Sequence, residues 1–152
     1  MANQSHLYAL KKGILFWNRW RQEHPEVLPD LSQSDLSKAN LAMADLSRAN
    51  LRFSNLSDAD LTHANLRDAN LSVSNLSGAN LREANLSKAD LTGADVTYAN
   101  LSDANLYSAN LKVSKFTGSD LRGADLTNAN VDGAIMDNIK RRKGRWSIFG
   151  GD

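Results

Sequence analysis

From Leu31 to Met136, every fifth residue of this chain is apolar, and most of these residues are Leu. This spacing defines 22 consecutive units of five residues over residues 29–138. On an α-helix, five residues advance by about 500°, so the Leu side chains would point to every face. On a strand of period two they would alternate between both faces. The repeat therefore needs a backbone that turns a corner in every unit, as in a β-solenoid.

The departures from the repeat predict how many units close one coil. Two positions before each apolar residue stands Ala in most units, and Ser replaces it at a spacing of 20 or 40 residues in Ser34, Ser54, Ser74 and Ser114. A recurrence of 20 residues means four units per coil, which is a square tube. We therefore predict an all-β solenoid, a quadrilateral β-helix of about 5.5 coils, with about 4.8 Å between stacked strands.

The stretches ADLSRANLRFSNL and ANLSDANLYSANL resemble the pentapeptide-repeat family, whose consensus is A(D/N)LXX. The resemblance implies a right-handed quadrilateral β-helix with the central Leu and the preceding Ala or Ser inside. The leading FWNRWRQEHPEVLPDLSQSDL resembles the segment before the repeats in many cyanobacterial members. Well understood members include quinolone-resistance proteins that mimic DNA to bind type II topoisomerases, and others are linked to cell differentiation. The resemblance thus implies a fold and leaves the function open.

The chain divides into an N-terminal helix and capping linker, the repeats, and a basic and aromatic C-terminal segment: residues 1–28, 29–138 and 139–152. Apolar residues at helical spacing predict one helix over 5–24, with Ser5 as N-cap and Pro25 as a stop. This helix could be a basic, Trp-bearing helix on a membrane surface. We favour a cap over the end of the tube, because an uncapped solenoid exposes apolar side chains at its end.

The C-terminal segment carries a basic cluster followed by Trp146 and Phe149. Such a cluster could bind phosphate groups of a nucleic acid. We favour a cap or a homodimer contact through this end, since clustered charges are common on ordinary surfaces. We therefore expect neither direct nucleic-acid binding nor membrane binding.

Catalytic chemistry has little support in the sequence. There is no Cys and there are only three His residues, so zinc-thiolate sites are excluded and an oriented triad has few possible bases. We expect no enzyme, no cofactor and, because the lack of Cys fits a reducing compartment, a cytoplasmic location. Two columns of outward residues carry charged or metal-binding side chains. The charges alternate in one column, which consists of Arg48, Asp68 and Lys88. The other column consists of potential metal ligands, His63, Glu83 and Asp103.

The alternating column is expected to form ion pairs between coils. The column of His63, Glu83 and Asp103 could hold a divalent metal, because an imidazole and two carboxylates are suitable ligands. An open face lacks a second shell, however, so we favour a solvated column.

The aligned outward residues Phe53, Val73 and Val113 are the better candidate for a binding surface. Packing under a terminal segment is the competing interpretation. The function we favour is a non-catalytic scaffold for an unknown protein partner. The alternative is DNA mimicry against a type II topoisomerase such as gyrase, but residues 29–136 mix 13 acidic with 9 basic residues, a net charge of only −4.

Overall fold

Every unit of the repeat turns its corner with one residue in the left-handed backbone region. This residue is the second after the central apolar residue, and its φ lies between 52° and 78° in all 22 units. Within the turn, the N–H of Ala59 donates to the carbonyl of Leu56 at 3.1 Å, and other units repeat this bond. Both features are typical of a type II turn. The corner keeps successive Leu side chains directed at one axis.

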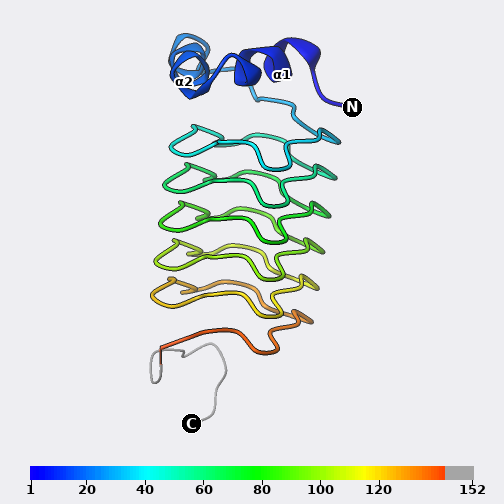
Figure 1. Ribbon diagram of the computed structural model, residues 1–152, viewed down its shortest axis with the longest axis vertical. Helices are drawn as coiled ribbons and strands as arrows, with labels where there is room; N and C mark the ends of the chain where they lie inside the picture. The colour runs from blue at the N-terminus through cyan, green and yellow to red at the C-terminus, as the bar shows by residue number, and fades with distance from the viewer. Residues whose placement is uncertain (143–152) are drawn as a thin grey trace.

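The corners close into coils of 20 residues. The computed structural model describes residues 1–142, and Figure 1 shows its coils stacked beneath two helices. Parallel bridges join residues 20 apart, from Asp30↔Asn50 to Asp120↔Lys140, which confirms four units per coil. Each side of the square pairs through a single residue, so the described residues form isolated bridges and no continuous strand. The right-handed sense implied by the resemblance stays a prediction.

The N–H groups of five consecutive residues each find a separate acceptor, as residues 55–59 illustrate. Two donate to the following coil, one donates to the preceding coil and one closes the turn. The fifth, the N–H of Ser57, donates to Oδ1 of Asn55 at 3.1 Å. This bond explains why Asn or Asp recurs before the central Leu, because its side chain satisfies a backbone donor at the corner.

The core is a stack of Leu side chains lined by Ala and Ser, as the sequence predicts. Phe116 is the aromatic residue inside the tube and is fully buried. Its neighbour in the adjacent coil is the smaller Val96, also fully buried, whose N–H donates to the carbonyl of Lys115 at 2.7 Å. We infer that the small Val96 makes room for the large Phe116, because protein interiors tolerate little excess volume.

The N-terminal cap consists of α1 (Gln4–Lys11) and α2 (Ile14–Glu23), which lie over the first coil (Figure 1). The prediction of one continuous helix was wrong, because the chain breaks at Gly13 with a φ of 107°. The break lets both helices fold over the same end of the tube. The N-cap is Asn3 and not Ser5: Oδ1 of Asn3 accepts from the N–H of Ser5 at 2.9 Å.

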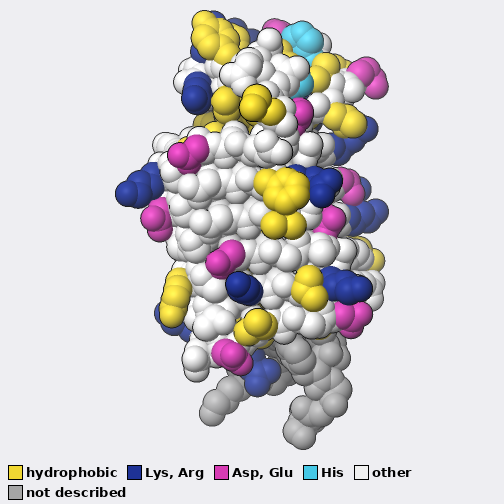
Figure 2. All heavy atoms as spheres, turned by 90° about the vertical axis from the view of Figure 1, so that its right-hand side faces the viewer, with side chains coloured by type: hydrophobic (Ala, Val, Ile, Leu, Met, Phe, Trp, Pro, Cys, Tyr) yellow, Lys and Arg dark blue, Asp and Glu magenta, His cyan; other side chains and the backbone are white. Residues whose placement is uncertain are grey.

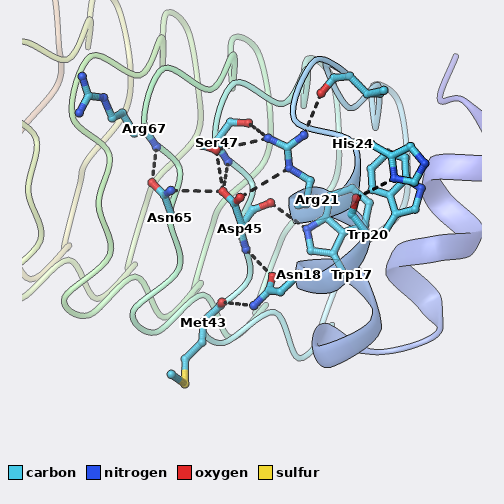
Figure 3. Close-up of polar contacts among 11 residues, drawn as sticks. Trp17, Asn18, Trp20, Arg21, His24, Met43, Asp45, Ser47, Asn65 and Arg67 are labelled. Atoms are coloured by element: carbon cyan, nitrogen blue, oxygen red, sulfur yellow. Dashed lines mark hydrogen bonds and ion pairs between the residues drawn. The ribbon is translucent and has the colours of Figure 1, made fainter.

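Side chains of the cap occupy the hydrogen-bonding positions that a preceding coil would fill (Figure 3). Trp17 Nε1 donates to the carbonyl of Asp45 at 2.8 Å, and Oδ1 of Asn18 accepts from the N–H of Asp45 at 2.8 Å. Arg21 Nη2 donates to the carbonyl of Ser47 at 2.9 Å. On the neighbouring side of the coil, His6 Nδ1 accepts from the N–H of Asp30 at 3.0 Å. The cap thus protects an exposed coil edge that could otherwise pair with another chain.

No helix within residues 1–142 is long and apolar enough to cross a membrane.

Candidate functional site

The outward column that begins at residue 53 is the candidate site. We call it the apolar column and define it as Phe53, Val73, Gly93, Val113 and Gly133, which follow one another in successive coils. Phe53, Val73 and Val113 are 50%, 53% and 52% exposed, so each presents about half of its surface to solvent. The structure therefore aligns the three residues as the sequence predicts, at the surface of the described part of the chain.

The two Val residues of this column stand in a costly backbone conformation. Their φ values are 56° at Val73 and 52° at Val113, in a region that β-branched residues rarely enter. Holding an L-residue there costs about 1–2 kcal/mol. Strained residues persist where the surroundings determine them, and they concentrate at functional sites.

Buried Ser hydroxyls reinforce the strained turns of the apolar column. Ser54 Oγ donates to the carbonyl of Leu51 at 2.6 Å, and the turns at Val73 and Val113 contain the same bond from Ser74 and Ser114. The two Gly turns of the column instead place Ala at this position, in Ala94 and Ala134. Ser119, after Gly118 on another side, shows that the hydroxyl is not confined to this column. Within the column, however, the extra bond accompanies the turns that carry a bulky residue.

Gly93 and Gly133 each lie next to a Val side chain of the preceding coil. A Cβ placed on Gly93 would lie 3.8 Å from Cγ2 of Val73, and one on Gly133 would lie 3.1 Å from Cγ1 of Val113. Each Val side chain therefore leans over the Gly of the next coil. Val73 and Val113 are thus separated along the apolar column by a residue without a side chain, Gly93. The residue pattern alone could not reveal the direction in which the side chains lean.

Basic side chains border the apolar column. The guanidinium carbon of Arg52 lies 5.2 Å from the centre of the Phe53 ring, a cation–π arrangement. Lys112 precedes Val113 and is exposed. Within residues 1–142, neither Arg52 nor Lys112 takes part in an ion pair. Figure 2 shows hydrophobic side chains following one another along the tube, with Lys or Arg side chains beside them.

In the column of potential metal ligands, His63 and Glu83 form a pair, and Asp103 does not join them in a three-ligand cluster. His63 Nδ1 lies 3.3 Å from Glu83 Oε2, and Glu83 Oε1 also meets Arg82 Nη2 at 3.0 Å. Asp103 leans the other way, over Gly123. Among the described residues, no three His, Cys, Asp or Glu side chains converge closely enough to hold a metal ion.

The predicted ion pairs along Arg48, Asp68 and Lys88 were wrong. Asp68 Oδ2 instead pairs with Nε of Arg67, its neighbour in sequence, at 3.2 Å. Both partners are largely exposed, and such a pair contributes little to stability. The remaining predicted binding residues, Trp146 and Phe149, lie outside the described residues.

The groups whose pKa responds most clearly to burial lie in the cap. Burial lowers the pKa of His6, opposed by the charge of Asp30, and burial also lowers the pKa of Arg21. The apolar column consists of Phe, Val and Gly, none of which titrates. Its geometry suits contact with another surface and offers no acid, base or nucleophile.

The repeat sequence decides the family. Eight copies match the family described as pentapeptide repeats, over residues 30–52, 54–93, 74–112, 84–123 and 104–140. The chain belongs to the pentapeptide-repeat family. A comparison with curated proteins finds no match.

Several solved pentapeptide-repeat proteins are similar to this one. Rfr23 from the cyanobacterium Cyanothece 51142 is 29% identical with a TM-score of 0.57, over 83% of this chain and 94% of Rfr23. The protein alr5209 from Nostoc PCC 7120 is 32% identical with a TM-score of 0.43, over 80% of this chain and 91% of its own. HetL from Nostoc sp. strain PCC 7120, described as involved in heterocyst differentiation regulation, is 29% identical with a TM-score of 0.40, over 73% and 69% of the two chains.

Proposed function

We propose that this pentapeptide-repeat protein is a non-catalytic scaffold that binds a protein partner along the apolar column. The observation that carries the proposal is the row of exposed Phe53, Val73 and Val113 side chains at positive φ. An exposed apolar row on a rigid rod is a common form of protein-binding surface. The lack of Cys supports a reducing compartment, such as the cytoplasm, as the place where it acts.

The chemistry beside the column indicates what the partner offers. Arg52 and Lys112 place positive charge next to the apolar column, and neither is neutralised by an ion pair within residues 1–142. A partner segment with apolar side chains and flanking carboxylates would complement both features.

The proposal is tested by affinity capture with the double variant Phe53→Ser, Val73→Ser. Protein from the native host that binds the wild type should be recovered at least about tenfold less well by the variant, because a loss of about 1.4 kcal/mol already weakens binding tenfold. Tyr98→Ser is the matched control, since Tyr98 is 75% exposed on another column. Equal recovery by wild type and double variant would exclude the apolar column as the binding surface.

DNA mimicry is the alternative function, and the charge pattern of the tube supports it less well. The tube carries a net charge of −4 in residues 29–136, with 9 basic residues interspersed among 13 acidic ones. A DNA-binding groove attracts dense charge of one sign. A gyrase supercoiling assay in which the protein inhibits at stoichiometric concentration would favour this function over the scaffold.

A homodimer through the C-terminal segment is a separate proposal about assembly. It is motivated by Trp146 and Phe149 at the end of the sequence. Light scattering on the eluting protein should give twice the chain mass for the wild type and a single mass for Trp146→Ser, Phe149→Ser. A single mass for the wild type would remove the proposal.

A further inference from the structure

The cap has a second, outward face. We define this outer cap face as Tyr8, Lys12, Leu15, Phe16 and Arg19. All five are exposed, and Leu15 is 90% exposed, the highest value for any large hydrophobic residue within residues 1–142. Figure 2 shows hydrophobic and basic side chains next to one another at the helical end of the molecule.

Helical geometry separates this face from the one that covers the tube. Trp17 and Arg21 are buried and donate hydrogen bonds to the first coil. Leu15 and Arg19 each lie two residues before them, a rotation of about 200° around α2. They therefore point away from the tube. One helix thus caps the solenoid and presents an apolar and basic surface at its end.

The outer cap face combines apolar and cationic groups in contact. The ammonium of Lys12 lies 4.7 Å from the ring centres of both Tyr8 and Phe16. In the described part of the chain, neither Lys12 nor Arg19 forms an ion pair. The acidic residues of the cap segment are Glu23 and Glu26, which lie beyond this face in the sequence. The surface is therefore complementary to negative charge.

We infer that the outer cap face docks the end of the rod onto an anionic phospholipid surface. Apolar and aromatic side chains next to Lys or Arg are the composition of helices that lie in a membrane interface. Leu15 projects freely, and a bilayer interface accepts such a side chain without a matching pocket. A cap and a membrane-surface helix are competing interpretations of the sequence, but the two faces of α2 allow both. This inference is independent of the partner proposed for the apolar column.

The test is co-sedimentation of the full chain with phosphatidylcholine vesicles that contain or lack phosphatidylglycerol. We expect at least about fivefold more bound protein with phosphatidylglycerol, since each basic residue near an anionic surface contributes about 1 kcal/mol. Added sodium chloride should reduce the binding, because it screens exposed charges. Leu15→Ser, Phe16→Ser should lower the binding at least about tenfold, because two apolar side chains no longer enter the interface.

Two variants keep this test decisive. Tyr98→Ser, an exposed aromatic on the side of the tube, should sediment like the wild type. Lys12→Gln should lower binding to anionic vesicles about fivefold, since one basic residue near an anionic surface contributes about 1 kcal/mol. Its melting temperature should stay close to that of the wild type, because the contacts of Lys12 with Tyr8 and Phe16 lie at the surface of the cap. Background sedimentation of the wild type with anionic vesicles would overturn the inference. Undiminished binding by Leu15→Ser, Phe16→Ser would also overturn it, and so would capture of a protein by this face in place of vesicles.

Discussion

At each corner of the tube, the repeat constrains the backbone conformation more strictly than the residue type. Every unit needs a left-handed residue at its corner, and 17 of the 22 corners use a residue other than Gly. At most corners a polar residue occupies this position, and Asn or Asp tolerates it well. Val73 and Val113 adopt this conformation at a higher cost in free energy, so they lower the stability of the tube while they add apolar surface.

Val73→Asn should therefore make the protein more stable. Asn enters the left-handed region at lower cost, so we expect the free energy of unfolding to rise by about 1 kcal/mol. Urea unfolding measures the change. Val73→Thr is the matched control, because Thr is also β-branched and keeps the strain. A gain in Val73→Thr equal to that in Val73→Asn would contradict the assignment of strain to the β-branch.

His6 should make the stability of the cap depend on pH. Its Nδ1 accepts from the N–H of Asp30, which requires a neutral ring, and burial lowers its pKa below the ordinary value of 6.5. Because the folded-state pKa is the lower one, the contribution of His6 is complete above the unfolded pKa. It is lost as the pH falls through the folded pKa.

The measurement compares wild type with His6→Gln in urea at several pH values. The difference in free energy of unfolding should shrink by about 0.5–1.5 kcal/mol, the value of one hydrogen bond, between neutral pH and about pH 5. Contributions of His24 and His63 cancel in this difference. A difference that stays constant over the range would show that the ring does not act as the acceptor.

At the scale of elements, the cap acts as a substitute coil. Asn18 both accepts from the N–H of Asp45 and donates to the carbonyl of Met43, at 2.8 and 3.0 Å. In the next coil the equivalent N–H, that of Asn65, donates to the carbonyl of Ala44 in the preceding coil at 2.9 Å, whereas the carbonyl equivalent to that of Met43 accepts no bond from that coil. A helix with no sequence relation to the repeat thus continues its hydrogen-bonding pattern.

Asn18→Ala should destabilise the first coil of the tube. Two backbone groups lose their partners, and we expect a loss of about 1–3 kcal/mol. Hydrogen exchange should be faster at the amide of Asp45 and unchanged at Asn85, two coils away in the same column. Gln22→Ala, exposed on the same helix, is the control. Unchanged exchange at Asp45 in Asn18→Ala would refute the substitute-coil account.

The pair Val96 and Phe116 should behave as one packing unit. Val96→Leu alone should cost about 1–3 kcal/mol through overpacking against Phe116. Phe116→Leu alone should also destabilise, because it leaves a cavity. Combined, the two changes restore a uniform Leu stack, and the double variant should be more stable than the sum of the single changes by about 0.5–3 kcal/mol. Strict additivity would mean that the two side chains do not compete for space.

At the scale of the whole molecule, the sequence predicts the tube better than its surface. The period of five, with departures every 20 residues, leads to coils confirmed by the Asp30↔Asn50 bridge and those that follow. The break at Gly13 escapes prediction, because apolar spacing continues across it and only the tube below requires two helices. The direction in which Val73 and Asp103 lean depends on the left-handed corner, which no residue pattern displays directly.

The ion pairs on the surface of the tube are likewise not predictable from the residue pattern. Residues that share a column lie one coil apart, yet Asp68 pairs with Arg67 next to it in sequence. Exposed ion pairs differ little in free energy, so a long charged side chain can pair with any nearby opposite charge. Alignment in a column alone therefore does not predict an ion pair. Alignment is informative where side chains are short and apolar, as in the apolar column.

Site-specific photo-crosslinking in the native host tests whether the apolar column contacts a protein partner. A benzophenone side chain would replace Val73 or Val113 in the apolar column, or Asp103 two sides away around the square tube. We predict the same protein adduct from positions 73 and 113 and none from position 103. Adducts of equal yield from all three positions, or from position 103 alone, would contradict this prediction.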